Sequence, residues 1–254
     1  MLLAVDVGNT NIVLGVFDAE RLVADYRLHT DDRATGDELG VLTTDLLARS
    51  GIAPADVHAV VVGNVVPTLQ RAVDRVARGY FDREPMVLGP GLRTGIRIRV
   101  DDPREVGADR IANAVAARHL YGVPAVLVDF GTATTFDAIG AEGEYLGGAI
   151  APGIQISHDA LVRNAALLRR VELVAPPAAI GRNTTTSMQA GIVFGYVGLV
   201  EGLVTRFRAE LGGTSRVIAT GGIAEQLAPL IACIDVVDER LTLTGLRLIY
   251  EQNR

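Results

Sequence analysis

Lysine is absent from this chain, so all 24 of its basic residues are arginine. That absence excludes a phosphate-binding loop of the GxxxxGK(S/T) type and a Schiff-base lysine, because both chemistries need the lysine amine. If the protein handles phosphate groups, their charge has to be met by metal ions, arginine and backbone N–H groups.

Cysteine and histidine are scarce as well. Cys233 is the only cysteine, which excludes an intramolecular disulfide, and the four histidines lack the spacing of a zinc site. His158 follows a glycine-rich turn, and we interpret it as a surface or capping residue. The net charge is −6 and the pI is near 5.3, so the chain lacks the basic surplus that displaces counterions from nucleic acids. We therefore expect no nucleic-acid partner.

Long apolar segments are missing too. No run of apolar residues is long enough to span a bilayer, and Met1 leads directly into a strand without a cleavable leader. These absences predict a cytoplasmic protein with no membrane partner. The 254 residues, 49% of them hydrophobic, suffice for one large domain or two ordinary ones.

Two turns that contain aspartate and glycine are the most informative features present. Each follows a strongly apolar strand, and they read Asp6-Val7-Gly8-Asn9-Thr10-Asn11 and Asp129-Phe130-Gly131-Thr132-Ala133-Thr134-Thr135. A carboxylate can hold a hydrated cation, glycine lets the backbone approach a ligand, and Thr and Asn offer polar groups. A nucleoside triphosphate with its metal ion requires this combination. Aspartate can also merely cap a turn, but both carboxylates end strands that contain no other polar residue, which favours a functional role.

The order of expected elements repeats between the two halves. Three strands at Leu2–Val7, Ile12–Phe17 and Leu22–Leu28 precede a helix and another strand, and Ala125–Asp129 opens a second copy. This order is typical of ribonuclease-H-like units. We predict an α/β protein with two tandem ribonuclease-H-like domains of the actin-like kinase type, residues 1–118 and 119–254, with a cleft between them. A further strand is expected at Gly95–Val100.

Two other segments could contribute chemistry. Gly107-Ala108-Asp109-Arg110 opens an apolar helix, where Asp109 could face the cleft and Arg110 could bind a substrate carboxylate. The same spacing also suits an ordinary capping aspartate paired with arginine, and spacing alone does not decide between these readings. Gly221 and Gly222 follow the strand Arg216–Thr220 and would let an adenosine approach the backbone closely.

The ordered set of motifs resembles the type III pantothenate kinases, the CoaX family of the actin-like kinase superfamily. The resemblance covers nearly the whole chain and rests on DVGNTN, GADR, DFGTATTFD, GGAIAPG, IGRNTT and TGG, in that order.

The resemblance implies ATP and pantothenate as substrates and assigns roles to residues. The ATP-binding residues would be Asp6, Val7, Gly8, Asn9, Thr10, Asn11, Ile12, Val13 and Thr132, with Gly221 and Gly222 at the adenosine. The pantothenate site would comprise Gly107, Ala108, Asp109, Arg110 and Thr184, with Asp109 accepting the proton of the primary hydroxyl. Asp129 would hold a monovalent cation, K⁺ or NH₄⁺, and Asp6 would hold Mg²⁺, directly or through water. The helix Ser187–Val204 would form a homodimer interface across which Thr184 reaches the substrate.

One departure and two alternatives accompany this reading. Many family members have a tyrosine where this chain has Val100, which could alter substrate affinity. A kinase for another small alcohol would keep both aspartate-glycine turns but need another acceptor site. A non-enzymatic regulator related to the Baf transcriptional activators could use the same scaffold, although Asp6, Asp109 and Asp129 are all intact.

Overall fold

The computed structural model describes all residues from Met1 to Arg254 and divides them into two compact units. The first unit contains Met1–Leu120 together with Arg240–Arg254, and the second contains Tyr121–Glu239. The boundary thus lies at Leu120 rather than at 118. The C-terminal segment, which we expected in the second domain, belongs to the first unit because its helix packs there.

The first unit is built on a five-stranded sheet with the order β3-β2-β1-β4-β5. β1 pairs antiparallel with β2 and parallel with β4, so the strand that ends in Asp6 lies at the centre. Its elements in chain order are β1 (Leu2–Val7), β2 (Asn11–Asp18), β3 (Arg21–His29), α1 (Gly36–Arg49), η1 (Pro54–Asp56), β4 (Ala59–Asn64), η2 (Pro67–Leu69), α2 (Gln70–Phe81), β5 (Pro85–Val87), η3 (Pro103–Glu105), α3 (Ala108–Tyr121) and α8 (Leu241–Asn253).

The second unit repeats this topology. Its sheet has the order β10-β9-β6-β7-β8, in which β6 pairs antiparallel with β7 and parallel with β9. The order matches the first sheet when β6 is set on β1, so the predicted duplication is confirmed. Its elements are β6 (Ala125–Phe130), β7 (Ala133–Ile139), β8 (Tyr145–Pro152), α4 (Ile154–Asn164), α5 (Thr184–Gln189), η4 (Ala190–Phe194), α6 (Gly195–Glu210), β9 (Arg216–Thr220), α7 (Ala224–Leu227), η5 (Ala228–Leu230) and β10 (Val236–Val237).

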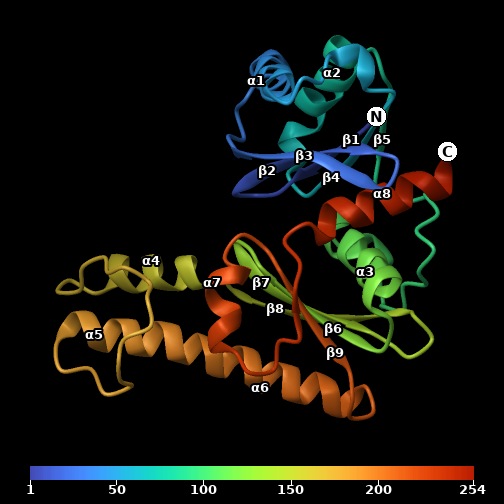
Figure 1. Ribbon diagram of the computed structural model, residues 1–254. Helices are drawn as coiled ribbons and strands as arrows, with labels where there is room; N and C mark the ends of the chain where they lie inside the picture. Colours follow the sequence, from blue (N-terminus) through green and yellow to red (C-terminus); the bar gives the residue numbers. More distant parts are fainter. The chain divides into compact units, whose positions relative to one another are not determined.

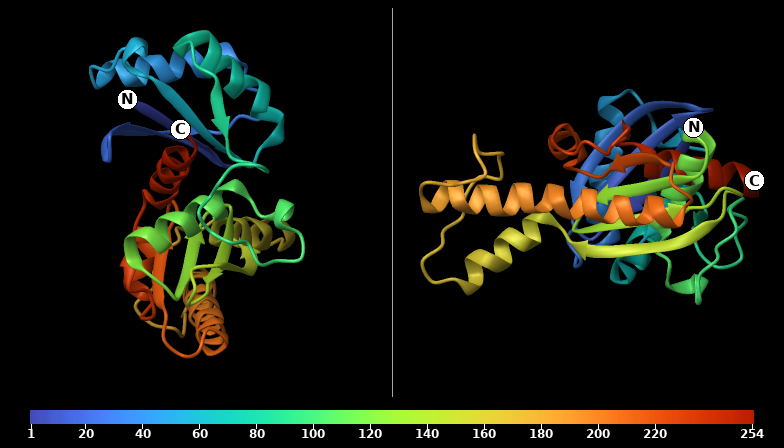
Figure 2. Two further views of the ribbon diagram at one scale, coloured as in Figure 1. Left: turned by 90° about the vertical axis from the view of Figure 1, so that its right-hand side faces the viewer. Right: turned by 90° about the horizontal axis from the view of Figure 1, so that it is seen from below.

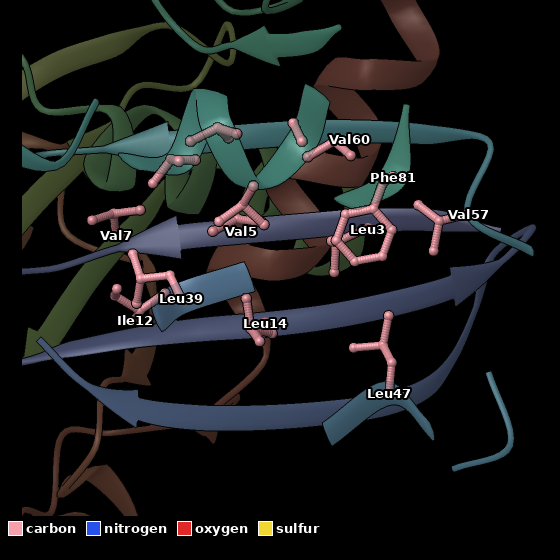
Figure 3. Close-up of a cluster of buried hydrophobic side chains, with 14 of the residues drawn as sticks. Leu3, Val5, Val7, Ile12, Leu14, Leu39, Leu47, Val57, Val60 and Phe81 are labelled. Atoms are coloured by element: carbon pink, nitrogen blue, oxygen red, sulfur yellow. The ribbon is translucent and has the colours of Figure 1, made fainter. Parts of the chain in front are cut away.

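The core of the first unit lies between the sheet and the helices α1 and α2 (Figure 3). Alternate residues of a strand face opposite sides, so Leu3, Val5 and Val7 all point into this core. Leu39 and Leu47 of α1 close it from the helix side. Asp6, which alternates with these residues, is therefore on the other face of the sheet.

That other face is covered by α8 (red in Figure 1). Leu243 and Leu246 of α8 are buried, and a Cβ added to Gly63 of β4 would lie 3.1 Å from Leu246 Cδ2. The last helix of the chain thus completes the first unit's second layer.

One long helix runs from Thr184 to Glu210 through α5, the π-helical turn η4 and α6 (orange in Figure 2, right). By length and composition alone this helix could cross a membrane, which corrects the expectation that no segment could. Tyr196, Val200 and Val204 pack with the sheet of the second unit, as in a core helix. The helix expected at Ser187–Val204 is confirmed within it.

The strand expected at Gly95–Val100 is wrong. Ile96 and Ile98 alternate with arginines as strand residues do, but the segment joins neither five-stranded sheet. Gly95 has φ +70°, which interrupts extended backbone at its start.

Candidate functional site

The first aspartate-glycine turn connects β1 to β2 and is held by a short set of backbone contacts. Gly8 N donates to Asn11 O at 3.0 Å, which closes the turn. Thr30, directly after β3, is buried and holds the turn through two hydrogen bonds: its Oγ1 donates to Gly8 O at 2.6 Å, and its N donates to Thr10 O at 2.9 Å. The turn is therefore fixed from a neighbouring strand.

The residues predicted to bind ATP divide into two groups within this turn. Asn9 and Thr10 are exposed, so their polar groups are accessible to a ligand. Val7 and Ile12 are buried in the core (Figure 3), so only their backbone could contact one. The arrangement presents backbone and small polar groups, as a phosphate requires.

Asp6 lies close to the start of α3. Asp6 pairs in register with Gly63 of the neighbouring parallel strand β4, so both residues face the same side of the sheet. A Cβ added to Gly63 would lie 3.8 Å from Ala108 Cβ, at the first position of α3. The first unit therefore brings the end of β1 and the Gly107–Arg110 segment into one region.

Asp109 lies in the first turn of α3 and is half-buried. Its Oδ1 accepts a hydrogen bond from Arg110 N at 2.8 Å. Burial raises the pKa of Asp109 above its ordinary value, and the hydrogen bond from Arg110 N and the Arg110 charge only partly oppose that rise. The carboxylate is thus a better proton acceptor than an aspartate with an ordinary pKa.

The second aspartate-glycine turn follows β6. Gly131 N donates to Ala133 O at 3.1 Å, and Thr132 between them is exposed. Gly221, just after β9, has φ +97°, and a Cβ there would lie 2.5 Å from Asp129 Oδ1. Only glycine lets the backbone of this residue adopt that conformation so close to the carboxylate. The second unit therefore brings Asp129, Thr132 and Gly221 together.

Two threonines flank Asp129 in the sheet. Thr135 of β7 and Thr220 of β9 are its register partners, so all three side chains share a face. The Thr135 hydroxyl is buried and has no hydrogen-bond partner within the protein. A buried hydroxyl without a hydrogen-bond partner costs free energy, and a ligand that coordinates to its oxygen would offset that cost.

Thr184 lies on a different part of the second unit. It is the exposed first residue of α5, and Asn183 caps this helix by accepting from Thr186 N at 2.9 Å. Thr184 lines a groove of about 720 Å³ between α4 and the long helix, together with Ser157, Leu161, Leu168, Gly191 and Tyr196. No residue of the Asp129 turn lines this groove.

Sequence reasoning missed Thr30 and Thr135 as parts of these turns. Thr135 stands in the DFGTATTFD motif, but only strand register places its hydroxyl beside Asp129. Thr30 carries no local signal, because it reaches the first turn through the pairing of β3 with β2. His158, expected at the surface, is buried at 2% exposure.

A duplicated unit of this topology, with a carboxylate and a glycine turn at the end of each central strand, is the fold of the actin-like ATPases and sugar kinases. The model of the type III pantothenate kinase family matches residues 2–206. The type III pantothenate kinase of Geotalea uraniireducens is 54% identical over 100% of this chain and 99% of that one. The chain belongs to the type III pantothenate kinase family and is a kinase.

Solved structures at lower identity show the fold. A protein described as a Baf-family transcriptional activator from Campylobacter jejuni has a TM-score of 0.63 at 21% identity, covering 99% of this chain and 98% of that one. One described as a 2-dehydro-3-deoxygalactonokinase from Sinorhizobium meliloti has a TM-score of 0.64 at 14% identity, covering 99% and 96%. A regulator and a kinase thus share this fold, so the fold alone does not choose between them.

Proposed function

We propose that this protein phosphorylates pantothenate with ATP to give 4'-phosphopantothenate, the first step of coenzyme A biosynthesis, in the cytoplasm. The observation that carries the proposal is 54% identity to a type III pantothenate kinase over the entire chain. The two carboxylate-bearing turns and the helix start at Asp109 supply the groups that phosphoryl transfer needs.

The two turns would hold the nucleotide. The closed β1–β2 turn, which begins at Gly8 and has Asn9 and Thr10 exposed at its centre, would bind phosphate oxygens through N–H and hydroxyl groups. Thr132, in the second turn, would contact phosphate oxygens through its hydroxyl, and the backbone at Gly221 and Gly222 would leave room for the adenosine. Because the chain lacks lysine, backbone and cations would carry the stabilisation of charge.

Asp109 would orient the primary hydroxyl of pantothenate and accept its proton late in the transfer. A loose transition state does not require full deprotonation beforehand, so a carboxylate with a raised pKa is sufficient. Arg110, next to it, would bind the substrate carboxylate as a planar, permanently charged fork.

The residues present fit two cations. No group of three or more His, Cys, Asp or Glu side chains could hold a metal ion, so a bound cation would combine at most two such side chains with neutral oxygens. Asp129 with the Thr135 hydroxyl suits K⁺ or NH₄⁺, and Asp6 suits Mg²⁺, which is commonly held by one carboxylate plus phosphates and water. When bound, these ions would neutralise negative charge on the phosphates.

The long helix supports a homodimer. Gly191, Gly195, Gly198 and Gly202 recur on one face at 3.6 residues per turn, opposite Tyr196, Val200 and Val204, which pack on the sheet. A Cβ added to Gly191, Gly195 or Gly198 would meet no atom within 4 Å, so this face is open within the chain. A second copy would pack closely there and bring its Thr184 to the pantothenate site.

The first experiment is an assay of pantothenate phosphorylation by the purified protein with ATP, Mg²⁺ and K⁺, beside Asp109→Asn. We expect product from wild type and a loss of about 10²–10⁴-fold in kcat for the variant, with ATP affinity nearly unchanged. Equal losses in turnover and ATP affinity would refute the proton-acceptor role. Full activity of the variant would agree with the proposed function but would contradict the role of Asp109 as proton acceptor.

A folding control makes that loss interpretable. Asparagine keeps the Oδ1 atom that accepts from Arg110 N, so Asp109→Asn should fold. Because burial raises the folded-state pKa of Asp109, its stabilising contribution is full in acid and is lost as pH rises through that pKa. The amide avoids this loss, so the variant should melt no lower than wild type at pH 7. Any difference in melting temperature between the variant and the wild type should disappear at pH values below the pKa of an unfolded aspartate.

The non-enzymatic regulator considered from the sequence shares only its fold with this chain, which belongs to a kinase family. Such a regulator would show nucleotide binding without phosphorylation of pantothenate or of any other small alcohol. A screen of alcohol acceptors in the same assay separates this candidate from a kinase of different specificity.

A further inference from the structure

The segment of residues 165–183, which we call the connecting segment, joins α4 to α5 and has no helix or strand of its own. It leads directly into Asn183 and Thr184 at the start of α5. Leu168 of this segment and Thr184 both line the 720 Å³ groove. The connecting segment therefore contributes to the surroundings of Thr184 in this groove.

His158 of α4 is one of the groups that hold it. The imidazole is only 2% exposed, and its Nε2 accepts a hydrogen bond from Val171 N at 3.2 Å. Because Nε2 accepts, the proton of the neutral ring is on Nδ1. Nδ1 is 3.7 Å from Asp159 Oδ1 and has no hydrogen-bond partner, so the contact with Val171 is the ring's one hydrogen bond.

Two more contacts hold the residues on either side of Val171, namely Arg170 and Glu172. Asp159 Oδ1 pairs with Arg170 at 3.0 Å, and Gln189 Nε2, from the end of α5, donates to Glu172 O at 3.0 Å. Gln189 is 9% exposed, so this amide bond is shielded from water, whereas the Arg170 side chain is 74% exposed and contributes little. Residues 170–172 are thus attached to α4 by a buried imidazole and to the long helix by a buried amide.

The attachment links α4 to α5 across the groove. Ser157 and Met188 both line the groove. His158 directly follows Ser157 in the sequence, and Gln189 directly follows Met188. Loss of the buried bond to Val171 would free residues 170–172 from α4 while leaving the Asn183 cap of α5 intact.

We propose that His158 is a positioning residue for pantothenate binding, which acts by fixing the connecting segment that lines the groove beside Thr184. This inference rests on the proposed role of Thr184 in binding that substrate. His158 itself touches neither the substrate nor ATP.

The test compares His158→Phe with His158→Gln. Phenylalanine fills the buried volume but cannot accept from Val171 N, whereas glutamine offers Oε1 at a similar reach. We expect His158→Phe to raise the KM for pantothenate about 3- to 10-fold, the equivalent of one lost hydrogen bond, with kcat and the KM for ATP within twofold of wild type. His158→Gln should restore the wild-type KM. An equal fall in kcat for both variants, or no change in KM for His158→Phe, would overturn the proposal.

Limited trypsin digestion supplies a readout that does not depend on activity. The chain has no lysine, so trypsin cuts only after arginine, and Arg169 and Arg170 are exposed in the connecting segment. His158→Phe should be cut there faster than wild type or His158→Gln. Unchanged cutting would show that His158 does not hold the segment. Faster cutting with an unchanged KM would remove the link to pantothenate, and absence of turnover by wild type would refute the proposed function instead.

Discussion

The chemistry available to Thr135 depends on its position beside Asp129 in the sheet. Its hydroxyl is buried beside Asp129 by strand register and makes no hydrogen bond within the protein. Thr134, the preceding residue, faces the other side of the sheet, where its hydroxyl contacts Tyr196 Oη. Adjacent threonines thus have separate roles, one in packing and one available to a ligand.

A cation test follows from this contrast. If Asp129 and Thr135 hold K⁺, replacing K⁺ by Na⁺ should weaken ATP use by wild type, and Thr135→Val should raise the KM for ATP in K⁺ by about tenfold. Thr135→Val should not destabilise the protein, because it removes a hydroxyl that lacks a partner. Steady-state kinetics in each salt measures both effects.

Thr134→Val is the matched control. It removes a bonded hydroxyl from the opposite face, so it should lower stability but leave the preference for K⁺ unchanged. Indifference of the wild type to the exchange of K⁺ for Na⁺ would contradict the cation role of Asp129.

At the scale of elements, α8 decides how the first unit is completed. It packs on the face of the first sheet that carries Asp6, and at Gly245 its backbone lies directly against the backbone of α3 at Ala112. A Cβ at Gly245 would overlap the carbonyl oxygen of Ala112 in α3, which is backbone and cannot move aside cheaply. Thr242 of α8 also donates to Asn113 Oδ1 of α3 at 2.7 Å. The contact therefore fixes the helix whose first turn holds Asp109.

Gly245→Ala should consequently lower the free energy of unfolding by about 3 kcal/mol, the upper part of the range for overpacked cores. Urea denaturation measures the change. Gly79→Ala in α2 is the control: it is an exposed helical position where the new methyl group would meet only the flexible Arg75 side chain. It should stabilise the protein by about 0.5–1 kcal/mol. Equal effects of both substitutions would contradict the close crossing of α3 and α8.

At the scale of the whole molecule, one topology occurs twice, and the elements outside the repeat differ between the units. The first unit gains α8 from the far end of the chain, and the second gains the long helix Thr184–Glu210. The open glycine face of that helix is what a second copy of the chain would cover.

Gly195→Glu should therefore disrupt the proposed homodimer. A charged side chain on the open face would not fit a closely packed interface, while the opposite face would still pack on the sheet. We expect the variant to elute as a monomer in size-exclusion chromatography with light scattering, and its KM for pantothenate to rise because Thr184 is no longer supplied by the partner.

Gly79→Glu introduces the same charge at an exposed helical glycine and should leave the assembly state unchanged. A wild type that is monomeric at assay concentration, with full activity, would refute the dimer and the role of Thr184 across it.

The sequence by itself determined the strands that end in Asp6 and Asp129, the duplicated order of elements, and the motifs that place the chain in its family. These features are local, because apolar runs, glycine turns and aspartate at a strand end are set by residues close together in the chain. The tertiary structure alone decided that α8 returns to the first unit, that Thr30 braces the first turn, and that His158 is buried against Val171. Each of these contacts joins segments distant in sequence, so strand register and packing select the partner, and no short pattern of residues encodes that choice.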